Sequence, residues 1–185
     1  MKYRKTIGAL VALIMVAMAL LPLGHGSFAS PTGQSWLPTR LVYYDDGALP
    51  NGDWRWEVWQ AGATWGEAGS DFSLAQATYY SNNDIRIGAA DYPYSVASAH
   101  RSPLSGNPLT WCETVFNQNM SFSVGGSPTS YDIQTVALHE FGHWLALGNV
   151  YDDSSKVMYY SISYGTVRTT LHQDDVNGII AIYGN

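Results

Sequence analysis

The segment TVALHEFGHWLALGN, residues 135–149, places His139 and His143 four residues apart and puts Glu140 directly after the first histidine. On a helix that advances by about 100° per residue, the two imidazoles stand one turn apart on the same face, where both can bind one metal ion. Glu140 lies about 100° round from His139, within reach of a water on that metal, so its carboxylate suits a general base rather than a ligand. This HExxH spacing indicates metal-assisted hydrolysis.

A catalytic zinc usually has three protein ligands and keeps a fourth position for water, so a third ligand is needed. Asn149 is the candidate for this position. On a continued helix its side chain would point about 80° away from His139, on the side opposite His143, and could not join the pair. Gly148 favours a turn that ends the helix, after which Asn149 can swing back toward the metal.

The helix that carries the motif is predicted over residues 132–147 and is apolar around most of its circumference. Such a helix belongs in the middle of a domain, because its whole surface must be covered. Hydrophobic periodicity predicts two further helices, at 54–65 and 174–183. Short segments punctuated by Gly, Pro and Asn predict strands at 40–44, 72–79, 84–89, 95–100 and 113–116. The chain shows no internal repeat, so we expect one α+β domain.

The beginning of the chain has the pattern of a secretory signal peptide. Three basic residues within the first five precede an apolar run over residues 7–21. This run falls short of the ~20 residues that span a bilayer. Small side chains favour cleavage after Ala29, with Gly26 as the alternative. We therefore expect a secreted, extracellular protein without stable membrane association, divided into a signal peptide at 1–29, a loose N-terminal arm at 30–39 and the functional domain at 40–185.

The composition excludes some functions and supports a packed core. Without residues 1–29, six Lys and Arg face fifteen Asp and Glu, a formal charge of −9 that argues against a nucleic-acid partner. The chain is 46% hydrophobic and contains 7 Trp and 13 Tyr, which suits a compact domain. The single cysteine, Cys112, cannot form a disulfide within the chain and is expected to be a small buried residue. We expect a monomer.

Three segments together resemble the matrixin branch of the metzincin zinc endopeptidases: HEFGHWLALGN at 139–149, VMYY at 157–160 and LHQDDVNGIIAIYG at 171–184. The DIRIGA and WCETVFN segments add to the likeness, which extends from about residue 40 to the C-terminus. The resemblance implies a single zincin-like catalytic domain. Such a domain has a small twisted mixed sheet, a central HExxH helix and a C-terminal helix after a methionine turn.

The resemblance also implies roles for individual residues. His139 and His143 would be zinc ligands, Glu140 the catalytic base and Met158 the turn methionine beneath the metal. The acidic pair at 174–175 would tie the last helix to this turn or to the mature N-terminus, although an ordinary acidic first turn explains the pair equally well. One catalytic Zn²⁺ is expected. Calcium is left open, because the aspartates form no recognisable loop.

The chain departs from the metzincin pattern HExxHxxGxxH at two positions. Ala146 replaces the glycine and is reluctant to adopt positive φ, so we expect the turn to shift toward Gly148. Asn149 replaces the third histidine, and an amide oxygen is a poorer zinc ligand than imidazole. Besides complete loss of the ligand, the residues leave three repairs open: weak ligation by Asn149, a carboxylate from Asp152 or Asp153, or approach of Tyr160, whose position resembles that of a metal-binding tyrosine in astacin-like relatives. Beyond the expected signal peptide, the other histidines are His100 and His172, which are interpreted as surface or loop residues.

We therefore predict a secreted zinc endopeptidase that hydrolyses peptide bonds of protein or peptide substrates by a zinc-activated water, with Glu140 as general base. Its activity is expected to be reduced, because the third ligand position is Asn149. The alternative is a catalytically inactive, protease-like secreted binding module that retains the cleft. Retention of Glu140 with both histidines favours the enzyme.

Overall fold

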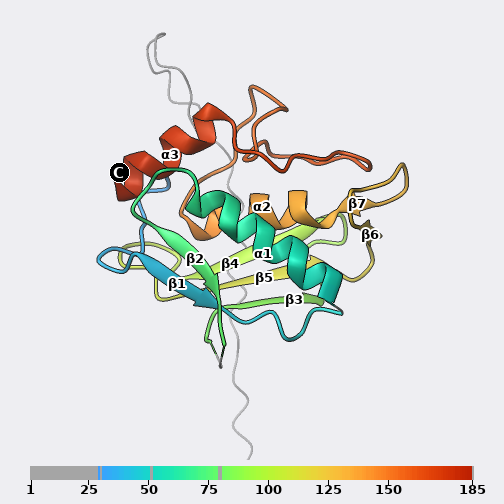
Figure 1. Ribbon diagram of the computed structural model, residues 1–185, viewed down its shortest axis with the longest axis horizontal. Coiled ribbons are helices and arrows are strands. Elements are labelled where there is room, and N and C mark those ends of the chain that lie inside the picture. Colours follow the sequence, from blue (N-terminus) through green and yellow to red (C-terminus); the bar gives the residue numbers. More distant parts are fainter. Residues whose placement is uncertain (1–28, 30, 51, 79–80, 185) are drawn as a thin grey trace, which may run out of the picture.

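The computed structural model describes residue 29 and residues 31–50, 52–78 and 81–184 (Figure 1). The expected signal peptide thus lies outside the described residues, apart from Ala29. None of the helices in these ranges has the length and apolar character needed to cross a membrane.

The elements follow the predicted order closely. The helices are α1 (Gly52–Gly66), α2 (Ile133–Trp144) and α3 (Gln173–Tyr183). The longer strands are β1 (Leu41–Tyr44), β2 (Ser73–Gln76), β3 (Asp84–Gly88), β4 (Ala97–Ser102) and β5 (Trp111–Asn117). Two further strands, β6 (Phe122–Ser123) and β7 (Tyr131–Asp132), were not predicted, because two residues are too few to show an alternating pattern.

The strands form a small mixed sheet. Strand β1 pairs in parallel with β2, and β5 pairs in parallel with β3 and antiparallel with β4. An isolated parallel bridge between Asp45 and Asp84 joins the two groups, so the strands follow one another as β2-β1-β3-β5-β4. Only the edge strand β4 runs antiparallel to its neighbour. The predicted α+β architecture is confirmed.

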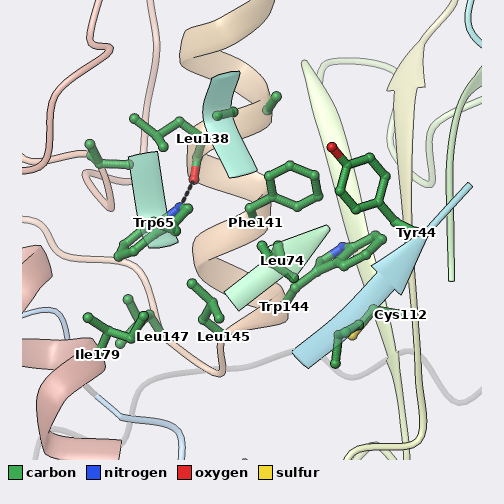
Figure 2. Close-up of a cluster of buried hydrophobic side chains, with 14 of the residues drawn as sticks. Tyr44, Trp65, Leu74, Cys112, Leu138, Phe141, Trp144, Leu145, Leu147 and Ile179 are labelled. Atoms are coloured by element: carbon green, nitrogen blue, oxygen red, sulfur yellow. Dashed lines mark hydrogen bonds between the residues drawn. The ribbon is translucent and has the colours of Figure 1, made fainter. Parts of the chain in front are cut away.

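The core lies between the sheet and the helices, as Figure 2 shows. Tyr44 of β1 contacts the rings of Phe141 and Trp144 on α2, with ring centroids 5.2 and 6.4 Å apart. The indole nitrogen of Trp65 on α1 donates to the backbone carbonyl of Leu138 at 2.8 Å, which joins the two helices. Helix α2 therefore lies in the centre of the domain, as its apolar circumference predicted.

Helix α2 ends earlier than predicted, in a Schellman motif. The amide of Ala146 donates to the His143 carbonyl and the amide of Leu147 to the Gly142 carbonyl, both at 3.0 Å. Ala146 has a φ of 66°, so the turn stands at the motif position and has not moved toward Gly148. The prediction of a displaced turn was wrong. A left-handed alanine costs about 1–2 kcal/mol, and the buried packing and hydrogen bonds of this turn outweigh that strain.

The N-terminal arm is packed against the end of α2 and is not loose, which corrects the prediction. Trp36 is buried, and its indole nitrogen donates to the Trp144 carbonyl at 2.8 Å. Three further donors bind neighbouring carbonyls. The Arg101 guanidinium donates to the carbonyl of residue 143, the Tyr183 hydroxyl to that of residue 145 and the Thr32 amide to that of residue 146. Residues from the arm, β4 and α3 thus hold the end of the metal-motif helix.

Candidate metal centre

The two motif histidines lie on the same face of α2, with ring centroids 4.8 Å apart and an angle of 88° between the ring planes. Nδ1 of His139 is 2.8 Å from the Val157 carbonyl oxygen, and Nδ1 of His143 is 2.9 Å from that of Leu147. A carbonyl oxygen only accepts hydrogen bonds, so each Nδ1 carries the ring proton. Both Nε2 atoms are then unprotonated, which is the tautomer that binds a metal.

Burial keeps both imidazoles neutral. Desolvation and the charge of His143 lower the pKa of His139 to about 3, against a smaller opposing effect of its hydrogen bonds. Desolvation likewise lowers the pKa of His143. The pair therefore needs no deprotonation near neutral pH before it binds a cation.

Glu140 lies beside the pair and is buried. Desolvation raises the pKa of its carboxyl to about 8, and the charge of His100 opposes this shift only weakly. A carboxyl whose pKa is near the working pH can both accept and return a proton, as a general base must.

The structure brings Asn149 to the histidine pair. Its side chain lines the same cleft as both histidines and is near enough to His139 to influence the pKa of that ring. The chain swings back as predicted, although it does so after the turn at Ala146. Among the described residues no three His, Cys, Asp or Glu side chains form a group that could hold a metal ion, so the third donor in reach is not one of these types.

Both motif histidines, Glu140 and Asn149 line one cleft of about 540 Å³. Tyr160 also lines this cleft, where its ring stacks on that of Tyr151 at a centroid distance of 5.0 Å. Of the predicted auxiliary residues, the structure therefore places Tyr160 at the site.

Asp152 and Asp153 do not line this cleft, contrary to the repair considered from the sequence. The Asp152 carboxylate accepts a hydrogen bond from Nζ of Lys156 at 2.8 Å. The Asp153 carboxylate accepts from the amide and hydroxyl of Ser155, both at 2.8 Å. Both carboxylates thus have partners in the turn at 152–156.

The other two histidines among the described residues have partners that the sequence did not reveal. His172 is the N-cap of α3, where its Nδ1 accepts a hydrogen bond from the Asp174 amide at 3.1 Å. His100 lies on β4, between two carboxylates. Neither residue was found from the sequence because no local motif surrounds it.

Met158 is fully buried beneath the motif helix. Its sulfur lies so close to Gly142 that a Cβ atom on that glycine would overlap it.

Asp175 of α3 fixes the methionine turn: its carboxylate accepts hydrogen bonds from the amides of Val157, Met158 and His172 at 2.9, 3.1 and 3.0 Å. The geometry matches the expectation that the acidic start of the last helix is tied to the methionine turn, with Asp175 as the residue that makes the contact.

Asp175→Ala should lower the free energy of unfolding by about 3 kcal/mol or more, because it leaves three amides without their shared acceptor in a buried site. Urea unfolding followed by tryptophan fluorescence measures the loss. Gln173→Ala, on the exposed side of the same helical turn, is the matched control and should stay within about 0.5 kcal/mol of the parent. Equal midpoints for the two variants would contradict this role of Asp175.

The sequence is similar to a known protein family and to individual metalloproteinases. The family model described as matrixin matches residues 57–184. Metalloendoproteinase 1 of Glycine max is 43% identical over 56 residues, which is 30% of this chain and 18% of the relative. Metalloendoproteinase 1-MMP of Arabidopsis thaliana is 42% identical over 60 residues, 32% of this chain and 16% of the relative. Matrix metalloproteinase-9 of Canis lupus familiaris is 36% identical over 80 residues, 43% of this chain and 11% of the relative. The matched segments thus span less than a fifth of these relatives.

Proposed function

Because this chain belongs to the matrixin family of zinc-dependent metalloendopeptidases, we propose that it hydrolyses peptide bonds, with His139, His143 and Asn149 as zinc ligands and Glu140 as general base. The observation that carries the proposal is the state of the histidine pair. Two backbone carbonyls fix the Nδ1 protons, and this leaves two neutral Nε2 donors beside one cleft.

The donor set fits zinc, which accepts imidazole nitrogen readily and an amide oxygen more weakly. Zinc bound there would supply the Lewis acidity that makes a water nucleophilic near neutral pH and polarises the scissile carbonyl. Glu140 would accept the proton of the attacking water and pass it to the leaving amine. The raised pKa of its buried carboxyl supports the second transfer, and a neighbouring cation favours the ionised form that begins the cycle.

Secretion is part of the proposal and rests on the basic and apolar pattern of residues 1–21. Ala29 is buried next to Gly178 of α3. Cleavage after Gly26, the alternative site, would keep this contact, whereas cleavage after Ala29 would remove it. Sequencing the N-terminus of the exported protein distinguishes the two.

A second candidate function, an inactive binding module on the same scaffold, is favoured by one observation. The third position is an amide, and no third His, Cys, Asp or Glu stands in its place within the part of the chain that the structure describes. Weaker metal retention follows from this donor set. This candidate requires that the zinc-loaded protein cleave no substrate.

Metal removal tests the two candidates against each other. Dialysis against a chelator should abolish cleavage of casein, and one equivalent of Zn²⁺ should restore it, because the proposed mechanism needs the metal to lower the pKa of the water and to polarise the carbonyl. The same amount of Ca²⁺ is the matched control and should not restore cleavage, since calcium needs six or more oxygen ligands. Full activity in chelated protein that contains no zinc would refute the peptidase mechanism. Zinc uptake without cleavage would support the binding module.

A further inference from the structure

His100 lies at the centre of a chain of charged groups outside the metal centre. Its Nε2 is 2.7 Å from a carboxylate oxygen of Asp91, and its Nδ1 is 3.1 Å from one of Glu113 on β5. On the far side of Glu113, Nε of Arg86 on β3 donates to the second carboxylate oxygen at 2.7 Å. The imidazole therefore joins a loop residue to the sheet.

The geometry requires a charged ring. Ionised carboxylates only accept hydrogen bonds, and a neutral imidazole has a single N–H, so both contacts are hydrogen bonds only when both ring nitrogens are protonated. Partial burial lowers the pKa of His100, but the hydrogen bonds and charges of Asp91 and Glu113 outweigh this and leave the pKa raised above its ordinary value. The imidazolium form is thus the form that the surrounding groups stabilise.

The loop held in this way is a wall of the candidate active-site cleft. Between β3 and β4, the segment 91–96 contributes most of its residues to the lining of the cleft that contains the motif histidines and Glu140. Asn117 holds the later part of this segment, since its side-chain amide donates to the carbonyls of Pro93 and Ser95 at 3.3 and 2.7 Å. At the start of the segment, the Asp91 carboxylate is bound by His100.

We propose that His100 is a positioning residue: its imidazolium form holds Asp91 and with it the start of the cleft wall at residues 91–95, and loss of the ring proton releases this start of the wall. The consequence for substrate binding rests on the proposed peptidase function. The release of the wall itself does not.

The direction of the pH dependence follows from the groups that face the ring. Asp91 of the loop and Glu113 of β5 favour the charged ring. Arg86 of β3, which also pairs with Asp84, keeps Glu113 ionised together with His100 itself, against the effect of partial burial. Glu140 of α2 is near enough for an electrostatic effect. Because the folded pKa is raised, the contact is complete below the ordinary histidine pKa of about 6.5 and is lost as the pH rises through the folded value.

Amide hydrogen exchange on the full chain tests the clamp without any need for catalysis. The Ser95 amide is the probe within the wall, since it donates to the Tyr92 carbonyl at 3.1 Å. In the parent, its protection, corrected for intrinsic exchange, should fall by about 10- to 100-fold as the pH passes the pKa of His100, as expected for loss of a charge-assisted hydrogen bond. His100→Gln should show the low protection at every pH. His100→Arg keeps a positive charge for both carboxylates and should show high protection without a pH step.

Asp91→Asn provides a second test that leaves β4 unchanged. It removes the negative charge on the loop side, so the step in protection should move to lower pH. A parent-like step in His100→Gln, or an unmoved step in Asp91→Asn, would overturn the proposal.

Peptide cleavage adds a readout that a merely structural role would not change. The parent should show a rise in KM with little change in kcat over the same pH range, and His100→Arg should not. If no variant cleaves peptide while the step in exchange is present, the clamp is supported and the peptidase function fails. If the parent cleaves peptide and its KM shows the same pH dependence as that of His100→Arg, the role in substrate positioning is overturned.

Discussion

Glu140→Gln should reduce kcat for casein cleavage by about 10²–10⁴-fold, the usual contribution of a positioned general base. The substitution keeps the shape of a buried side chain and removes the group that takes the proton from the attacking water. Zinc content should stay at the parent level, since this residue is proposed to act beside the metal and not on it.

Glu57→Gln is a matched control, because it makes the same chemical change on a buried glutamate of α1, away from the cleft. Its activity should remain within about twofold of the parent, as expected for a change outside the reacting groups. Cleavage by Glu140→Gln at the parent rate, with zinc bound, would show that another group handles the proton.

Asn149→His should raise the affinity for zinc by about 10- to 100-fold or more, given that even changes in the partners of metal ligands alter affinity by this amount. Imidazole nitrogen is a better zinc donor than a neutral amide oxygen, and the side chain at this position already lines the cleft together with both histidines. Competition with a chromophoric chelator measures the affinity, and casein cleavage at limiting zinc should rise with it.

The variant Asn149→Ala tests whether the Asn149 amide binds zinc weakly or does not bind it at all. If the amide contributes to binding, the alanine variant should bind zinc more weakly than the parent, which in turn binds it more weakly than the histidine variant. Equal affinities for all three would exclude position 149 as a ligand and direct attention to Tyr160, which lines the same cleft.

Most of the helix and strand pattern could be predicted from the sequence, because it depends on short-range periodicity. The motif helix is a clear case: the spacing of His139, Glu140 and His143 has a single helical interpretation, and the structure places all three around one cleft. The buried Cys112 also follows from the ordinary preference of a free thiol.

The errors arose where tertiary contacts decide the outcome. Ala146 adopts a positive φ because the end of α2 is held by distant residues, and intrinsic preference alone would have moved the turn. The Pro/Gly/Ser-rich arm was expected to be loose, yet one aromatic residue within it, Trp36, fixes it to the core. His100 could not be recognised, since its partners come from a loop and from another strand.

The packing of Met158 under Gly142 restricts which residues fit at one position of the HExxH motif. In HExxH the third and fourth letters are free, but here a side chain at the fourth position, Gly142, would overlap the sulfur of Met158 unless the methionine moved. The contact joins two segments that are separate in the sequence, so a larger residue at position 142 requires the side chain at position 158 to move or to become smaller. A sequence search for distant relatives of this chain should therefore score positions 142 and 158 together, and should not treat the fourth position of HExxH as unrestricted.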